Sequence, residues 1–430
     1  MRYKPLNSSI YNRNRLNFMN QMKEDSMAIF NSNDIYPVSA DSELPFEQHR
    51  DIFHLTGIDQ EETILILYPS SKDSKTRENL FIRKSDEHTK IWEGEKLTKQ
   101  LASELSGIES VYFVEDFKNI LHYISSKIDT FYINKNEHYR ANSPVETRED
   151  RFISWLLKKY PAHKVEKSNP ILQRLRSIKH LDEINQIKKA CQITKKGFDR
   201  VLKFIKPGVW EYQIEAEFIH EFINNSSKGF AYSPIIASGL DNNVLHYVKN
   251  NKQCKDGELI LMDVGAEYGN YSSDMTRTIP VSGRFSKRQR EVYNSVLNVK
   301  NEATKLLKVG NNWKTFHEQV GEIMTKELLN IRLIDKVDIK NETKKNPAYK
   351  KYFMHGTSHH LGLDTHDYGL LEDTFQENMV FTVEPGIYIP KEGFGVRLED
   401  DVVIKSNGEP INLMVDIPIE AEEIEDIMNS

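Results

Sequence analysis

Short apolar runs and amphipathic segments share the first 170 residues of the chain. Residues 10–22 and 148–160 have the three-to-four spacing of helices. Five runs have the length and composition of strands: SMAIFNS, TILILYP, NLFIRK, SVYFVED and DTFYINK. This mixture predicts an α/β domain over residues 1–170, which ends in the polar, proline-bounded stretch PAHKVEKSNP.

The remaining residues, 171–430, form a second predicted domain. Apolar residues recur every three or four positions over 178–205, which predicts a long amphipathic helix, and a second helix is predicted over 211–224. A third is predicted over 286–308, because SKRQ places a serine at the N-cap and a glutamine three positions later. Four further runs are strand-like: ELILMDVGAEY, YSSDMTRTIPV, MVFTVEPGIYI and GVRLEDDVVI.

Composition and charge exclude several function classes. Apolar residues make up 38% of the chain and the net charge is −6, so the surface is polar and the overall field does not attract nucleic acid or anionic lipid. The run TILILYP is far shorter than the roughly 18 apolar residues of a membrane helix, and the N-terminus has no apolar signal-peptide core. We therefore expect a cytoplasmic protein that binds neither nucleic acid nor membrane. Cys191 and Cys254 are too few for a disulfide framework and are predicted to be plain thiols.

Acidic residues recur at the ends of two apolar runs. Asp263 follows ELILM and is followed by Asp274, while Glu384 follows MVFTV and is followed by Glu399, which suggests an internal duplication. A buried carboxylate is costly unless it is paired, protonated or bound to a cation. A salt bridge or a strand-end cap would explain either strand-end acid alone. Four acids with few cations nearby in sequence favour a metal.

Histidines are concentrated in one segment, MHGTSHHLGLDTHD. It contains His355, His359, His360 and His366, and its two glycines disfavour a long helix. One histidine would be explained as a hydrogen-bonded structural residue, whereas four in one loop favour metal ligands. Four carboxylates with one or two imidazoles suit manganese, cobalt or zinc, and so many acids suit a centre with two ions. HExxH, GxSxG, the phosphate loop and a helix-opening GxGxxG are absent, so the sequence does not support a helical zinc-protease site or serine or cysteine nucleophiles.

The order and spacing of these motifs resemble those of the pita-bread metallopeptidases, most closely the aminopeptidase P family. The matching segments are LHYVKN, LILMDVGAEYGNYSSDMTRTIPVSG, FMHGTSHHLGLDTHDYG, FTVEPGIYI and GVRLEDDVVI. In the first domain, ADSELPFEQHRDIFHLTG is similar to the family's N-terminal signature and favours aminopeptidase P over prolidase. The resemblance implies an α/β (α+β) architecture, in which an N-terminal α/β domain precedes a pita-bread catalytic domain. That domain would have a curved, mostly antiparallel sheet flanked by helices.

The resemblance also implies a metal site. Two divalent ions, commonly manganese in this family, would be held by Asp263, Asp274, His359, Glu384 and Glu399. Asp274 and Glu399 would bridge the ions. Glu384 would also carry a proton from water to the leaving proline nitrogen.

Substrate contacts are implied for three histidines. His246, His355 and His366 match residues that line the family's substrate site, and Arg397 matches an arginine whose charge offsets and orients the carboxylates. Taken alone, His246 could be a solvated loop residue and Arg397 an exposed strand residue. Two departures from the family, a short IPKEGF loop and His360 in place of a bulkier apolar residue, concern pocket depth and side-chain preference.

The expected function is that of a metallo-aminopeptidase with two ions. It would remove the first residue from peptides whose second residue is proline, and it would form a homodimer or homotetramer. Prolidase, which cleaves Xaa-Pro dipeptides, is the alternative within the same fold. A catalytically idle pita-bread protein that binds peptides or proteins is the alternative from another class, although it would need no complete ligand set.

Overall fold

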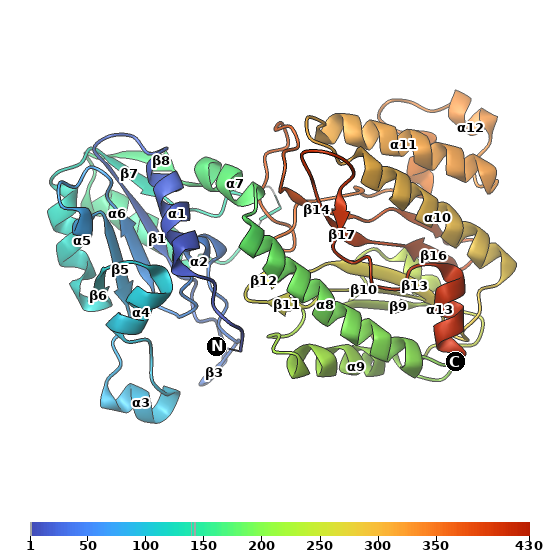
Figure 1. Ribbon diagram of the computed structural model, residues 1–430, viewed down its shortest axis with the longest axis horizontal. Helices are drawn as coiled ribbons and strands as arrows, with labels where there is room; N and C mark the ends of the chain where they lie inside the picture. Colours follow the sequence, from blue (N-terminus) through green and yellow to red (C-terminus); the bar gives the residue numbers. More distant parts are fainter. Residues whose placement is uncertain (1, 139, 142) are drawn as a thin grey trace. The chain divides into compact units, whose positions relative to one another are not determined.

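The computed structural model describes residues 2–138, 140–141 and 143–430, which form two compact units (Figure 1). The N-terminal unit is Pro5–Arg176, and the C-terminal unit is Ser177–Ser430 together with residues 2–4. The division falls at the end of helix α7 (Asn169–Ser177). None of the helices in the described part of the chain combines the length and apolarity needed to cross a membrane.

A mixed six-stranded sheet forms the centre of the N-terminal unit. Its strand order is β6-β5-β4-β1-β7-β8, with β1 antiparallel to β4 and parallel to β7. The strands are β1 (Ser26–Asn31), β4 (Ile64–Leu67), β5 (Glu78–Ile82), β6 (Ser110–Phe113), β7 (Thr130–Ile133) and β8 (Lys164–Lys167), and a separate ribbon pairs β2 (Pro37–Ser39) with β3 (Ser42–Glu43). The helices are α1 (Ser8–Met19), α2 (Arg50–Thr56), α3 (Glu87–Glu93), α4 (Lys99–Ser106), α5 (Phe117–Ser125) and α6 (Arg148–Lys159).

Both faces of this sheet are covered by helices. Ala28 and Phe30 of β1 belong to the core formed with α1, α2 and α4, whereas Met27 and Ile29 belong to the core formed with α5 and α6. Successive strand side chains point to opposite faces, so a fully apolar strand is buried on both sides. This burial explains why β1 reads as a continuous apolar run.

The C-terminal unit is built from short antiparallel strands. Its two three-stranded sheets have the orders β13-β10-β9 and β14-β17-β18, and β11/β12 and β15/β16 form two-stranded pairs. The strands are β9 (Ile235–Ser238), β10 (Leu259–Val264), β11 (Glu267–Tyr268), β12 (Tyr271–Ser272), β13 (Met275–Pro280), β14 (Val380–Val383), β15 (Gly386–Ile389), β16 (Phe394–Arg397), β17 (Asp400–Val403) and β18 (Ile411–Asn412). Each predicted duplicate half thus contains an antiparallel pair, β10/β13 or β14/β17.

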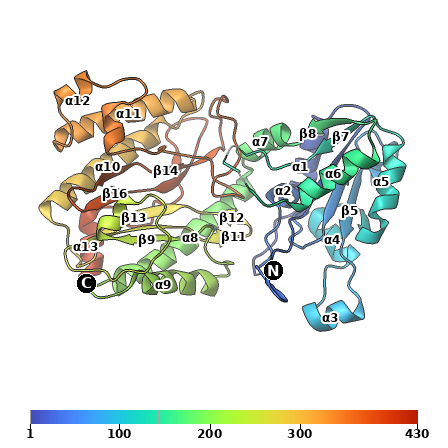
Figure 2. The ribbon, with the colours of Figure 1, turned by 180° about the vertical axis from the view of Figure 1, so that it is seen from behind.

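Helices flank these strands. They are α8 (Leu181–Phe204), α9 (Glu211–Asn224), α10 (Lys287–Leu306), α11 (Trp313–Asn330), α12 (Lys336–Lys340) and α13 (Ala421–Met428). Helix α8 packs against α9, and α10 packs against α11, as both views show (Figures 1 and 2). The helix predicted over 211–224 is confirmed, and so is the capping box of Ser286 and Gln289 at the start of α10.

Several predicted elements differ in their boundaries, and each of the four strand-like runs predicted for the second domain is two strands in different sheets. The helix predicted over 178–205 begins at Leu181, because His180 adopts an extended backbone and forms a capping box with Glu183. The run MVFTVEPGIYI is two strands in different sheets, separated by Glu384 and Pro385. A proline has no N–H to donate to a ladder, so the strand ends there.

Both cysteines are free thiols in the interior. Cys191 is 1% exposed and its Sγ lies 3.4 Å from Oδ2 of Asp401, and Cys254 is equally buried. Burial raises the pKa of the Cys191 thiol well above its usual range and that of Cys254 to about 12. The prediction that both are plain thiols is confirmed.

Candidate metal centre

The two antiparallel strand pairs carry the four predicted acids. Asp263 lies in β10 opposite Thr276 of β13, and Asp274 directly precedes β13. Glu384 directly follows β14, and Glu399 directly precedes β17. The prediction that Asp263 ends its strand is off by one residue, because Val264 continues the ladder.

Asp274, His359 and Glu399 converge on one point. Each offers a ligand atom, these atoms all lie within 4.8 Å of one another, and all three residues are buried. Nε2 of His359 lies 3.4 Å from Asp274 Oδ2 and 3.8 Å from Glu384 Oε1. Nδ1 of His359 lies 3.0 Å from the carbonyl of His360. A proton on Nδ1 donates to that carbonyl and leaves the lone pair on Nε2, the nitrogen that faces the acids.

Tyr232 connects Asp263 with Asp274, one of the three converging residues. Its hydroxyl lies 2.7 Å from Oδ1 of Asp263 and 2.5 Å from Oδ1 of Asp274. One hydroxyl proton can be donated to only one of these oxygens, so the other close contact requires an added proton or a cation. The arrangement therefore fits a bound cation. No motif in the sequence pointed to Tyr232.

Asp274, Glu384 and Glu399 resist ionisation because they are buried. Burial raises the pKa of Asp274 and of Glu399 well above their usual ranges; the charge of Asp263 adds to the first shift and that of Asp274 to the second. Burial raises the pKa of Glu384 to about 7, although the charges of His359 and Arg397 oppose it. A cation would offset both the burial and the repulsion. Carboxylate oxygens with one imidazole form the hard donor set that divalent manganese, cobalt or zinc accepts.

Arg397 starts a chain of hydrogen bonds that fixes His355. It is 3% exposed, which excludes the exposed-strand interpretation, and its Nη2 lies 2.6 Å from Oδ2 of Asp263. Its Nη1 donates to the Tyr388 hydroxyl at 2.9 Å, so that oxygen accepts, and the tyrosine proton goes to Nε2 of His355 at 2.7 Å. Nδ1 of His355 then donates to the carbonyl of Gly356 at 2.8 Å. Burial lowers the pKa of His355 to about 3, which agrees with a neutral ring.

The other histidines of the segment divide between the centre and the core. The rings of His366 and His359 meet edge to face with centroids 4.4 Å apart. His360 instead packs in the core, with its ring 4.5 Å from Phe381. His246 is exposed, and its charge contributes to lowering the pKa of His355.

Hydrogen bonds from neighbouring residues hold Glu399 and Asp274 in place. Thr276 Oγ1 donates to Oε2 of Glu399 at 2.7 Å, and the backbone N–H of Asp274 donates to Oδ2 of Asp401 at 3.0 Å. Sequence reasoning did not single out these residues or Tyr388. Thr276, Tyr388 and Asp401 lie in the segments that resemble the family, but this position in the sequence does not show which side chain each of them contacts.

Two family models match the chain. Residues 185–406 match metallopeptidase family M24, and residues 11–132 match the aminopeptidase P N-terminal domain. The chain is 32% identical to the Xaa-Pro aminopeptidase of Escherichia coli (strain K12), with 97% of each chain covered. It is 31% identical to Xaa-Pro aminopeptidase 3 of Homo sapiens, covering 95% of this chain and 82% of that protein.

Solved structures give the same result. Zinc-substituted E. coli aminopeptidase P in complex with product is 30% identical, with a TM-score of 0.88 and 99% of each chain covered. Pseudomonas aeruginosa aminopeptidase PepP has the same identity and TM-score, with 99% of this chain and 98% of that one covered. The predicted N-terminal α/β domain and pita-bread domain are confirmed. The chain belongs to metallopeptidase family M24 and, within it, to the aminopeptidase P family.

Proposed function

We propose that this protein is a metal-dependent Xaa-Pro aminopeptidase, which hydrolyses the bond between an N-terminal residue and a following proline. The observation that carries the proposal is the convergence of Asp274, His359 and Glu399, whose ligand atoms lie within 4.8 Å of one another. Membership in the aminopeptidase P family and similarity to proteins named Xaa-Pro aminopeptidase support the substrate class.

The proposed centre holds two divalent ions, most suitably manganese, with cobalt and zinc as alternatives. The proposed ligands are Asp263, Asp274, His359, Glu384 and Glu399. When bound, the ions would polarise the scissile carbonyl and activate a water molecule. The acid-rich donor set and the raised pKa values of Asp274 and Glu399 support this assignment.

Glu384 is the proposed proton carrier. Its side chain is 20% exposed, compared with 6% for Asp274, so it is the more accessible of the two acids beside His359. The nitrogen of a proline residue in a peptide carries no hydrogen, so peptidases that require a hydrogen bond from the N–H of the scissile amide cannot cleave the bond before proline. Glu384 instead delivers a proton to the leaving nitrogen.

Three histidines are the proposed substrate contacts. His355 presents a neutral ring whose orientation is fixed by Tyr388 and Gly356. His366 lies against the proposed ligand His359, and the exposed His246 is available to a peptide. We propose that they hold the scissile carbonyl and the proline residue.

The test is Glu384→Ala, assayed on an Xaa-Pro-Xaa peptide with metal content measured on the same sample. We expect activity to fall by several orders of magnitude. Glu409→Ala, at an exposed position, is the matched control and should retain normal activity. Near-normal cleavage by Glu384→Ala would refute the mechanism.

Two measurements separate the alternatives. Prolidase activity would favour Gly-Pro over a longer Xaa-Pro peptide, whereas the proposed activity favours the longer one. A catalytically idle binding protein would not carry about two ions per chain when purified without dialysis. The domain limits 1–170 and 171–430, the cytoplasmic location and the homodimer or homotetramer stay predictions.

A further inference from the structure

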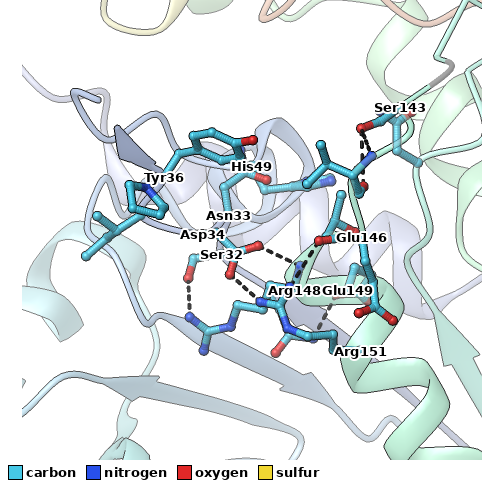
Figure 3. Close-up of a pocket in the computed structure, with 16 residues that line it drawn as sticks. Ser32, Asn33, Asp34, Tyr36, His49, Ser143, Glu146, Arg148, Glu149 and Arg151 are labelled. Carbon is cyan, nitrogen blue, oxygen red and sulfur yellow. Dashed lines mark hydrogen bonds and ion pairs between the residues drawn. The ribbon is translucent and has the colours of Figure 1, made fainter. Parts of the chain in front are cut away.

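A cavity of about 640 Å³ lies within the N-terminal unit (Figure 3). It is lined by the end of β1, the segment that follows it and the first residues of α6. Its volume is within the roughly 300–1,000 Å³ typical of small-molecule sites. The wall contains both charged side chains, among them Arg148 and Glu149, and apolar ones, among them Tyr36 and Val145.

Glu149 is a buried acid in this wall. It is 8% exposed, and its Oε2 accepts a hydrogen bond from Nδ2 of Asn31 at 2.8 Å. Its Oε1 is also buried and has no hydrogen-bond partner among the described residues. Burial raises the pKa of Glu149 to about 8. A buried oxygen without a donor is costly, and an N–H group in the cavity would satisfy it.

Arg148 is the neighbouring residue, and its guanidinium lies in the field of nearby acids, among them Glu62 and Asp34, without a hydrogen-bonded carboxylate among the described residues. Its Nη1 donates to Ser32 Oγ at 3.2 Å, and it forms no ion pair with any described acid. Asp34 is engaged elsewhere, by the backbone N–H of Arg148 at 2.7 Å and by the guanidinium of Arg151 at 2.5 Å. A guanidinium with open donors is well suited to bind a carboxylate.

We propose that this cavity binds a small zwitterion, namely a free α-amino acid or a dipeptide. Arg148 pairs with the ligand's carboxylate, and Glu149 accepts from its ammonium group. The guanidinium of Arg148 and the unpartnered carboxyl oxygen of Glu149 match a molecule that carries both a carboxylate and an ammonium group, whereas a simple anion or cation would engage only one of them. Tyr36 and Val145, 48% and 47% exposed, offer apolar surface to the ligand's side chain.

Calorimetric titration of the full-length, metal-loaded protein tests this proposal. The probe is Gly-Leu, which has no proline and is not a substrate of the proposed activity. N-acetyl-Gly-Leu lacks the ammonium group and Gly-Leu-amide lacks the carboxylate, so each should bind about tenfold more weakly or worse. Equal affinity for all three compounds, or no saturable binding of Gly-Leu up to about 10 mM, would overturn the proposal.

Variants locate the site independently. Arg148→Met and Glu149→Leu should each weaken Gly-Leu binding by about tenfold or more, since each removes one hydrogen-bonding contact to a charged group of the ligand. Lys158→Met, on the exposed side of the same helix, is the control and should bind normally. Unchanged binding in both cavity variants would place the ligand elsewhere and refute the proposal. Calorimetry measures binding without turnover, so a failure of this proposal can be told apart from a failure of the proposed peptidase activity. N-acetyl-Gly-Leu and Gly-Leu-amide are tested on the natural protein, so the comparison with them does not depend on whether a variant folds.

Discussion

The hydroxyl of Tyr388 lies 2.7 Å from Nε2 of His355 and donates its proton to that nitrogen. Because Arg397 has only donors, the direction of the whole chain from Arg397 through Tyr388 to His355 is determined. The ring of His355 therefore carries its proton on Nδ1. A basic residue that contacts the acidic cluster thus sets the tautomer of a proposed substrate contact.

Tyr388→Phe removes this hydroxyl and keeps the ring that fills the core. We expect kcat/KM on an Xaa-Pro peptide to fall roughly tenfold or more, because His355 loses the partner that orients it. Metal content should not change. Tyr123→Phe, at a side chain that is 63% exposed, is the control. A kcat/KM equal to that of the unmodified protein would show that the hydroxyl does not position His355.

Asp401→Ala tests the support behind Asp274. The variant leaves the buried backbone N–H of Asp274 without its acceptor at 3.0 Å, which costs about 1–3 kcal/mol. We expect a lower free energy of unfolding and weaker metal binding, measured by urea denaturation and metal titration. Asp401→Asn keeps a side-chain oxygen and should lose less. Equal losses in the two variants would contradict this role for the oxygen.

Arg277 and Asp400 form a buried ion pair. Nη2 of Arg277 lies 2.7 Å from Oδ1 of Asp400, both side chains are at most 2% exposed, and Nη1 also donates to the carbonyl of Glu399 at 2.6 Å. Arg277→Met leaves Asp400 with Lys300 as its remaining cation, so we expect the free energy of unfolding to fall by about 3–5 kcal/mol. Arg284→Met, at a side chain that is 73% exposed, should change it little. A small effect of Arg277→Met in urea denaturation would show that the pair is dispensable.

Glu149 should make stability depend on pH. Burial raises its pKa from 4.5 to about 8 in the folded protein, so the folded state holds the proton more tightly than the unfolded state. Its favourable contribution is complete below the unfolded pKa and is lost as pH rises through the folded pKa. Glu149→Gln cannot ionise, so its stability relative to the natural protein should increase between about pH 4.5 and 8, by a few kcal/mol at most.

Urea denaturation across that interval measures the difference. Glu104→Gln, at an exposed position, is the control and should show no such trend. If the stability difference between Glu149→Gln and the natural protein does not vary with pH, the pKa of Glu149 is not raised.

Sequence reasoning succeeded where the signal was local. The helical period over 211–224 and the capping box of Ser286 depend on neighbours a few positions away, and the structure has both. The predicted metal ligands lie in strand-and-turn motifs that the aminopeptidase P resemblance identified. Antiparallel pairing of β10 with β13 and of β14 with β17 then accounts for the approach of the acids within each pair, and the backbone hydrogen bond from Glu399 to Thr276, at 3.0 Å, joins the two pairs.

Long-range partners could not be predicted in this way. Tyr232 contacts an acid 42 positions later, and Asn31 contacts Glu149 across 118 positions. Nothing in the neighbourhood of either residue specifies such a contact, because it depends on how distant elements pack. The cavity beside Glu149 therefore had no signature in the sequence.

The interior location of both thiols has a practical use. Thiol-directed dyes react with exposed thiolates, and neither Cys191 nor Cys254 presents one. A cysteine placed on the surface would therefore be the only attachment point for a fluorophore or spin label, with no need to replace the native residues first. Labels placed in pairs, one in each unit, would follow the spacing of the two units in solution as peptides bind.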